Sequence, residues 1–360
     1  MTMTPLPLEP PFGHRDPHGM AALVDAIPEQ VEQALARTNA TPWQKPKHAP
    51  DLVAFGGMGG SAIAGELTGA TYADELPHPW LVVRDYQWPA CVTAGSLAVL
   101  SSNSGDTQET LALEAQARQR GVPCVAISSG GELSSRAMAG GYDLQHVPGG
   151  MPPRAALFHA WVPVSRLPAA LGWTADPEPD WREAVSVLRE YRDNLGVDAP
   201  ESRNPAKQLA RMLVGRTVLI YSGPGGPAAV GTRWRQQLNE NAKILAHSAA
   251  VPEQNHNEIV GWQVASDATS AVSIVLLRDR EDSAEVTLRL RLASEYAVRQ
   301  GATVHQATSD GESRIARLAS LAQFGDYVSL YLALAGGVDP TDITSIDDFK
   351  RRLAESAQAR

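Results

Sequence analysis

The chain has 360 residues, of which 43% are hydrophobic and 20% are charged. These fractions are typical of folded globular proteins and exclude a disordered or fibrous chain, and the length is enough for two α/β domains. With 40 acidic and 31 basic residues the formal net charge is −9, and no basic run occurs, so we expect no nucleic-acid partner, because binding to nucleic-acid phosphates requires clustered Lys and Arg.

Nothing in the sequence predicts a membrane partner or a disulfide framework. The proline-rich first residues lack a basic segment followed by an apolar core, and no run of about 18 apolar residues follows. Cys91 and Cys124 lie on separate predicted elements and have no C-x-x-C or zinc-ligand spacing. We therefore expect a cytoplasmic protein.

The first predicted elements are a helix and then a sheet. Apolar side chains recur at helical spacing over residues 17–38, which predicts one long amphipathic helix. From Asp51, short apolar runs alternate with helix-sized segments, which is typical of a doubly wound parallel sheet. The strand candidates are residues 51–57, 80–85, 96–102, 123–128 and 142–147.

A second set of strands follows a polar, proline-containing connection at about residues 174–205. Its clearest members are residues 217–224, 271–278 and 302–308. The first strand of each set ends in a glycine-rich turn, at 55–62 and at 221–231, which suggests two copies of one α/β unit. An apolar helix ending at the glycine pair 336–337 and a short helix that Ser345 could cap complete the chain.

The glycine-rich turn after the first strand is a candidate anion site. Residues 56–61 read GGMGGS and offer several backbone N–H groups close to a helix start, with the hydroxyl group of Ser61 beside them. A dinucleotide would use a similar loop, and Asp85 follows the second strand where a ribose-binding acid could sit. Ala62 takes the third glycine position, which tolerates alanine, so the loop alone leaves both readings open.

A second polar loop follows the third strand. Residues 101–110, SSNSGDTQET, gather hydroxyl groups around one glycine before a predicted helix, which suits a phosphate monoester. An ordinary Ser/Thr-rich turn with a helix cap would read the same way. Because ligands bind at the carboxyl ends of the strands in a doubly wound sheet, the two loops together favour a phosphate site.

These two loops resemble those of the sugar isomerase (SIS) domain. Three further strings, MPPRAA at 151–156, LNENAK at 238–243 and PEQNHNEIVGW at 252–262, are similar to those of the bifunctional phosphoglucose/phosphomannose isomerases. The resemblance covers about residues 50–355 and implies an α/β fold with two SIS-type, flavodoxin-like parallel-sheet domains. The expected division is 1–45 for a tail and helix, 46–170 and 206–340 for the domains, 171–205 for their connection, and 341–360 for a terminal helix.

The resemblance also implies a reaction and roles for residues. The expected reaction interconverts glucose 6-phosphate or mannose 6-phosphate with fructose 6-phosphate through a cis-enediolate, without metal or redox cofactor. Glu240 is the implied proton-transferring base, which we expect to be buried, and Arg154 offsets the enediolate charge. His256 and Lys350 are the implied ring-opening groups. The substrate phosphate is expected at Gly59, Gly60, Ser61, Ser102, Ser104 and Thr107.

Two positions depart from the family pattern. Asp106 stands where asparagine is expected and Asn103 where an aromatic residue is expected. A carboxylate beside a phosphate dianion is unfavourable unless it points away or pairs with a cation.

The resemblance further implies a homodimer in which His256 is supplied across the subunit interface. The spacing of His247, His256 and Glu258 matches no common zinc site. A non-catalytic phosphosugar-binding SIS protein and a nucleotide-dependent oxidoreductase are the alternative functions.

Overall fold

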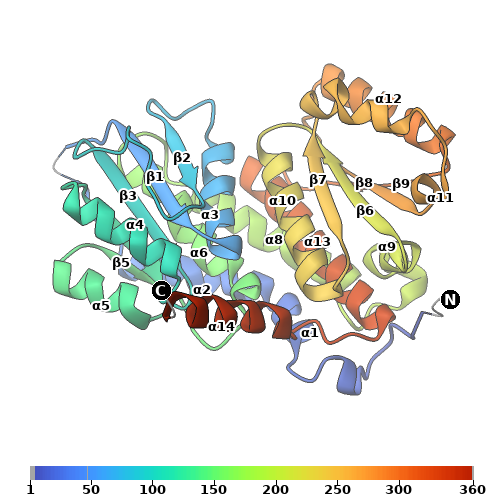
Figure 1. Ribbon diagram of the computed structural model, residues 1–360, viewed down its shortest axis with the longest axis horizontal. Coiled ribbons are helices and arrows are strands. Elements are labelled where there is room, and N and C mark those ends of the chain that lie inside the picture. Colours follow the sequence, from blue (N-terminus) through green and yellow to red (C-terminus); the bar gives the residue numbers. More distant parts are fainter. Residues whose placement is uncertain (1–4, 47, 359–360) are drawn as a thin grey trace.

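The structure, a computed structural model, describes residues 5–46 and 48–358. Figure 1 shows two lobes, each built around one parallel sheet, with helices between the sheets and on their outer faces. The predicted α/β fold with two parallel sheets is confirmed. The division of the chain into domains at the predicted residue bounds stays a prediction.

The first sheet has the strand order β2-β1-β3-β4-β5. Its parallel strands are β1 (Leu52–Gly57), β2 (Trp80–Val83), β3 (Ser96–Ser102), β4 (Cys124–Ser128) and β5 (Leu144–His146), connected in part by α3 (Gly59–Thr71), α4 (Gln108–Gln119) and α5 (Gly131–Gly140). The order reverses between β1 and β3, where Gly57 pairs with Ser101. Both polar loops therefore begin at the topological switch point, where ligands bind in this fold.

The second sheet repeats this arrangement with the order β7-β6-β8-β9. Its strands are β6 (Thr217–Ser222), β7 (Ala246–Ala250), β8 (Val272–Arg278) and β9 (Thr303–Thr308), with α10 (Gly226–Ala242), α11 (Asp267–Ser270) and α12 (Ala284–Arg299) in the connections. The predicted repeat of one unit is thus seen in the strand order. Strand β7 was absent from the prediction, because its sequence AHSAA carries no β-branched residue and no Phe, Tyr or Trp.

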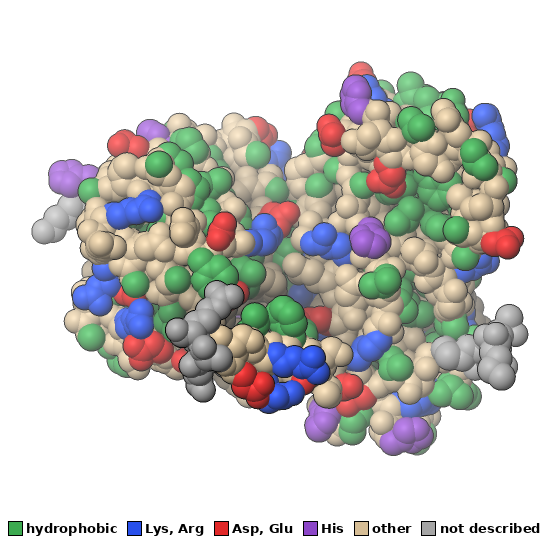
Figure 2. Space-filling view, viewed as in Figure 1, with side chains coloured by type: hydrophobic (Ala, Val, Ile, Leu, Met, Phe, Trp, Pro, Cys, Tyr) green, Lys and Arg blue, Asp and Glu red, His purple; other side chains and the backbone are tan. Residues whose placement is uncertain are grey.

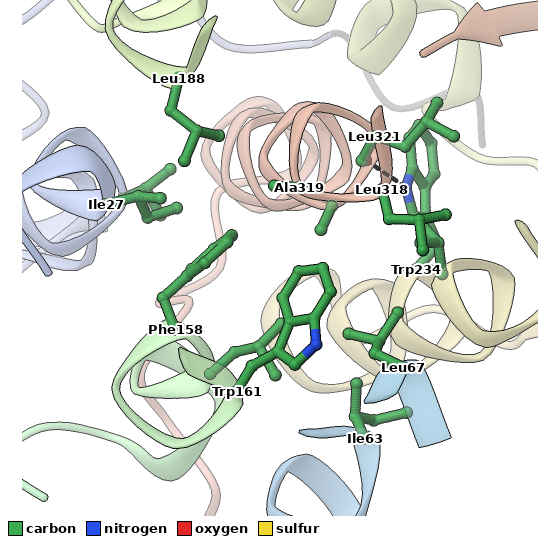
Figure 3. Close-up of a cluster of buried hydrophobic side chains, with 14 of the residues drawn as sticks. Ile27, Ile63, Leu67, Phe158, Trp161, Leu188, Trp234, Leu318, Ala319 and Leu321 are labelled. Atoms are coloured by element: carbon green, nitrogen blue, oxygen red, sulfur yellow. Dashed lines mark hydrogen bonds between the residues drawn. The ribbon is translucent and has the colours of Figure 1, made fainter. Parts of the chain in front are cut away.

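A central helix, α13 (Arg314–Gly336), joins the two lobes. It contacts α10, α8 (Glu178–Leu195) and α9 (Pro205–Leu213). Figure 3 shows apolar side chains from several helices converging on α13, among them Ile63 of α3, Trp161 of α6 (Leu157–Ser165) and Trp234 of α10. By length and composition α13 could cross a membrane, but 94% of its apolar window is buried inside the fold, as expected of a core helix.

Two local predictions need correction. The expected helix at 17–38 is two helices, α1 (Met20–Asp25) and α2 (Ile27–Ala40), because the backbone leaves the helical region at Ala26, just before Pro28. The expected polar connection, to which no element was assigned, consists largely of α8, whose apolar face is buried. The terminal helix, α14 (Thr344–Gln358), begins before Ser345, and the side chain of Asp342 accepts a hydrogen bond from the backbone N–H of Thr344.

The remaining short helices are η1 (Gly13–Arg15), η2 (Pro153–Ala155), α7 (Leu167–Ala170), η3 (Glu201–Arg203), η4 (Glu253–His256) and η5 (Glu258–Trp262).

Candidate active site

The glycine-rich loop after β1 leads directly into α3. Gly59, the first residue of α3, has a left-handed backbone with φ of 49°, a conformation that favours glycine. A Cβ atom on Gly57 would lie 2.9 Å from the backbone oxygen of Ser101, so only glycine allows β1 and β3 to approach this closely. The N–H groups at the start of α3 therefore lie at the edge of the sheet, where they can hold an anion.

The hydroxyl-rich loop after β3 is held to the glycine-rich loop by hydrogen bonds. The backbone N–H of Asn103 donates to Ser61 Oγ at 3.3 Å, which joins the two loops. Ser102 Oγ lies 2.8 Å from Thr107 Oγ1 and accepts from the N–H of Gly105 at 3.0 Å. The structure thus brings the predicted phosphate-binding residues of both loops to one edge of the first sheet.

Asp106 is directed away from these hydroxyl groups. Its Oδ1 accepts a hydrogen bond of 2.9 Å from the backbone N–H of Glu132, in the first turn of α5. A carboxylate at a helix N-terminus is stabilised by the free N–H groups there. Asp106, which departs from the family pattern, therefore links the hydroxyl-rich loop to α5.

A cavity of about 360 Å³ lies beside the glycine-rich loop, between α3 and α10. In the space-filling view of Figure 2 the surface is hollowed between the two lobes, and basic side chains lie near the hollow. Among the described lining residues, Glu240 is the one acid against three arginines, of which Arg233 is already paired with the buried Asp326, so Arg154 and Arg235 remain. The lining also includes Gly59, Gly60, Arg154, Arg233, Arg235, Gln236, Gln237, Asn239, Ala246 and His247. This excess of positive charge suits an anionic ligand.

Arg154 and Glu240 meet in this cavity. Arg154, in η2, is buried, and its Nε lies 3.8 Å from Glu240 Oε2 near the end of α10. The guanidinium is fixed by hydrogen bonds to Asn241 Oδ1 at 2.7 Å and to the backbone oxygen of Pro340 at 2.6 Å. Burial lowers the pKa of Arg154, but a guanidinium keeps its proton in proteins. A fixed cation therefore stands beside a carboxylate.

The expectation that Glu240 is buried is wrong for the single chain, since its side chain remains 34% exposed. Burial was expected because Glu240 stands between Asn239 and Asn241. However, Glu240 lies only two residues before the end of α10, where the cavity opens. A half-buried carboxylate of this kind remains accessible to a ligand that fills the cavity.

His256 and Lys350 lie outside this cavity. His256 ends η4 and is exposed, in a segment where Glu258 accepts a hydrogen bond from the hydroxyl group of Tyr221. Lys350 is exposed on α14, next to Phe349, which is also exposed. Instead His247, at the start of β7, lines the cavity. This cavity therefore brings together Gly59, Gly60, Arg154 and Glu240 of one chain. The two predicted ring-opening groups do not line it, and neither do the predicted phosphate-binding residues Ser61, Ser102, Ser104 and Thr107.

The equivalent position in the second sheet differs. The glycine-rich turn before α10 faces a cavity that Asp279 and Arg317 also line. Arg317 donates to Asp279 at 2.8 Å, and both side chains are almost fully buried. Glu281 and Asp282 also line this cavity, so among its described lining residues three acids stand against two arginines, which suits an anionic ligand less well than the first cavity.

Sequence reasoning missed several residues of the cavity, including Arg233, Gln237 and His247. Arg233 and Gln237 precede Glu240 by seven and three residues on α10, so they lie on the same helix face. Helical spacing from Glu240 was the signal that could have found them. The position of His247 depends on β7, which the sequence did not indicate.

Comparison with known proteins identifies relatives over most of the chain. Residues 202–353 match the family described as the bacterial phospho-glucose isomerase C-terminal SIS domain. A bifunctional phosphoglucose/phosphomannose isomerase from Caldicellulosiruptor bescii is 36% identical over 91% of this chain and 97% of that relative. One from Aquifex aeolicus is 30% identical over 85% of this chain and 91% of its own length.

A solved structure shows the same fold at lower identity. The tagatose-6-phosphate ketose/aldose isomerase of Escherichia coli superposes with a TM-score of 0.69 at 14% identity, covering 90% of this chain and 95% of that chain. Together with the matched SIS-domain family, this likeness confirms the predicted SIS-type fold class. On the strength of the curated relatives, which match it over most of its length, the chain belongs to the family of bifunctional phosphoglucose/phosphomannose isomerases.

Proposed function

We propose that this protein interconverts glucose 6-phosphate, and also mannose 6-phosphate, with fructose 6-phosphate. The observation that carries the proposal is the basic cavity in which Arg154 Nε and Glu240 Oε2 lie 3.8 Å apart beside Gly59 and Gly60. An aldose/ketose isomerisation needs one base and one fixed positive charge near a bound phosphate. The family supports the same reaction. The two alternative functions, a nucleotide-dependent oxidoreductase and a non-catalytic phosphosugar-binding protein, are not favoured.

In the proposed mechanism Glu240 moves one proton between adjacent carbons. Its carboxylate removes the C2 proton of the open-chain aldose, the C–H electron pair forms the C1–C2 double bond, and the carbonyl electrons move onto O1. The resulting cis-enediolate is stabilised by the Arg154 guanidinium. A proton then passes from O2 to O1, and Glu240 returns its proton to C1 to give the ketose.

Substrate binding is proposed at the two loops of the first sheet. The N–H groups at the start of α3, with Gly59, Gly60 and Ser61, would hold the phosphate together with the hydroxyl groups of Ser102, Ser104 and Thr107. Hydrogen bonds already connect the loops through Ser61 and Asn103. This connection holds the two loops together before the substrate binds, which reduces the ordering cost of binding.

Ring opening is proposed to require a second copy of the chain. His256 is exposed and outside the cavity of its own chain, so it is free to enter the cavity of a partner. Apolar side chains lie exposed near it, Val260 and Val264 in the same segment and Leu288 and Leu292 on α12, which contacts η5. Covering these side chains would favour a homodimer. Lys350, on the exposed α14, is the proposed second ring-opening group.

Mixing two inactive variants tests this arrangement. Glu240→Gln and His256→Ala proteins, unfolded together and refolded at equal concentration, should recover about a quarter of the wild-type activity, because half of the dimers are mixed and each holds one intact site. Each variant refolded alone serves as the control. No recovery would mean that ring opening uses a group of the same chain, and His247 would then be the nearest histidine.

Turnover of each hexose 6-phosphate tests the function itself. The purified protein, given glucose 6-phosphate or mannose 6-phosphate, should form fructose 6-phosphate, detected by a coupled enzyme added after the reaction is stopped. The rate should be the same with and without a chelator and without nicotinamide. Glu240→Gln should be inactive. Its matched control, Glu190→Gln, changes an exposed glutamate of α8 and should keep full activity. A protein that forms no ketose from either substrate would refute the proposal. The cytoplasmic location stays a prediction.

A further inference from the structure

Unpartnered polar atoms gather on the cavity face of α10. Among the described residues, Arg233 Nε, Gln236 Oε1 and Gln237 Oε1 are buried atoms without a hydrogen-bond partner, and all three side chains line the cavity. Gln237 is 2% exposed. A buried acceptor without a partner is costly, so such a cluster indicates that something else supplies the missing hydrogen bonds.

The orientation of the Gln237 side chain is determined by Asp326 of α13. Gln237 Nε2 donates to Asp326 Oδ1 at 2.8 Å, and Arg233 donates to Asp326 Oδ2 at 2.8 Å. An ionised carboxylate only accepts hydrogen bonds, so the amide nitrogen must face it. The amide oxygen of Gln237 is therefore left as an acceptor without a partner among the described residues, on a side chain that lines the cavity.

We propose that Gln237 Oε1 accepts a hydrogen bond from a hydroxyl group of the bound hexose and that Gln237 is a specificity-determining residue of the isomerase. The inference rests on the proposed function. Gln237 precedes Glu240 by three residues, or about 4.5 Å along the helix axis. Since Glu240 acts at C1 and C2, the acceptor reaches the hydroxyl group on C3 or C4. The other face of the amide is occupied by Asp326, so Gln237 cannot turn away from a substrate that lacks this hydroxyl group.

Deoxy substrates test the proposal. For wild type, Gln237→Met and Gln30→Met, kcat/KM is measured with glucose 6-phosphate and with its 3-deoxy and 4-deoxy analogues. Gln30 is the matched control: it is also buried, its Nε2 donates to one backbone oxygen at 2.9 Å, its Oε1 has no partner among the described residues, and it does not line the cavity.

Wild type and Gln30→Met should lose about tenfold in kcat/KM with one of the two analogues, because the acceptor is then left unpaired. Gln237→Met should lose about tenfold with glucose 6-phosphate and nothing further with that analogue, since the two changes remove the same hydrogen bond. Should Gln237→Met fail to fold, Gln237→Asn withdraws the same amide by one methylene and must remove the same discrimination.

Two results are distinguishable. An equal loss for Gln237→Met on all three substrates would mean that Gln237 only supports the fold, and it would overturn this inference while leaving the isomerase proposal intact. Absence of turnover by the wild-type protein would refute the isomerase proposal itself.

Discussion

The buried ion pair between Arg233 and Asp326 should make stability depend on pH in a defined direction. Both side chains are almost fully buried and lie 2.8 Å apart, on the two helices that join the lobes. Arg233→Met removes the cation and leaves a buried carboxylate, which costs about 3–5 kcal/mol of unfolding free energy near neutral pH. Arg189→Met is the matched control, because Arg189 and Glu32 also lie 2.8 Å apart but are 46% exposed, and it should cost less than about 1 kcal/mol.

The sign of the pH effect follows from the pKa of Asp326. Burial raises this pKa, and Arg233 opposes the rise. The folded state therefore holds the proton to a higher pH than the unfolded state, so stability falls as pH rises from about 3.9 through the folded pKa. Removing Arg233 raises the pKa of Asp326 further, so the variant should lose more stability than wild type on going from about pH 5 to about pH 8.

Urea unfolding at the two pH values, followed by circular dichroism, measures the effect. The loss caused by Arg233→Met should be larger at the higher pH, and adding Asp326→Leu to it should recover much of the loss, because the uncompensated charge is then gone. A loss that is equal at both pH values, or no larger than that of Arg189→Met, would refute the reasoning.

Three further substitutions probe the packing and the phosphate loop. Gly325→Ala places a methyl group 2.3 Å from Trp234 Nε1, so urea unfolding should show a loss of about 1–3 kcal/mol, and unchanged stability would contradict this packing. Asp106→Ala removes the acceptor for the N–H of Glu132 and should cost about 1 kcal/mol with an unchanged KM, whereas a large change in KM would mean that Asp106 contacts the substrate. Gly105→Ala places its methyl group 1.9 Å from a backbone oxygen at a φ of 80°, so the loop must move and KM for glucose 6-phosphate should rise at least about tenfold, and a wild-type KM would show that the loop does not hold the phosphate.

The sequence predicted most of the fold because its local signals agree. Eight of the nine strands were expected, since branched and apolar residues cluster between glycine-rich turns. The exception, β7, consists of small and polar residues and pairs with β6 through its backbone. The break between α1 and α2 was missed because the apolar spacing continues across Ala26, although Pro28 was a local signal against one continuous helix.

The candidate site was predictable where it depends on short motifs and unpredictable where it depends on packing. Gly59 and Gly60 lie in a loop whose residues are adjacent in the sequence, whereas Asp326 lies 93 residues from Arg233 and 89 from Gln237. Contacts at such separations arise from the way α13 packs between the lobes, and no local pattern encodes them. The motif around Glu240 likewise gave no indication of its exposure, because the cavity forms only when α3 and α10 meet.

Exchange of the C2 hydrogen with solvent tests the role of Glu240 most directly. Glucose 6-phosphate is incubated in deuterium oxide with wild type or Glu240→Gln, the C2 position is followed by proton NMR, and binding is measured by calorimetry. We expect deuterium to appear at C2 with wild type and to be absent with Glu240→Gln, which should still bind the substrate, because only the proton acceptor is lost. Exchange at the wild-type rate by Glu240→Gln would contradict the account, since another group would then remove the proton.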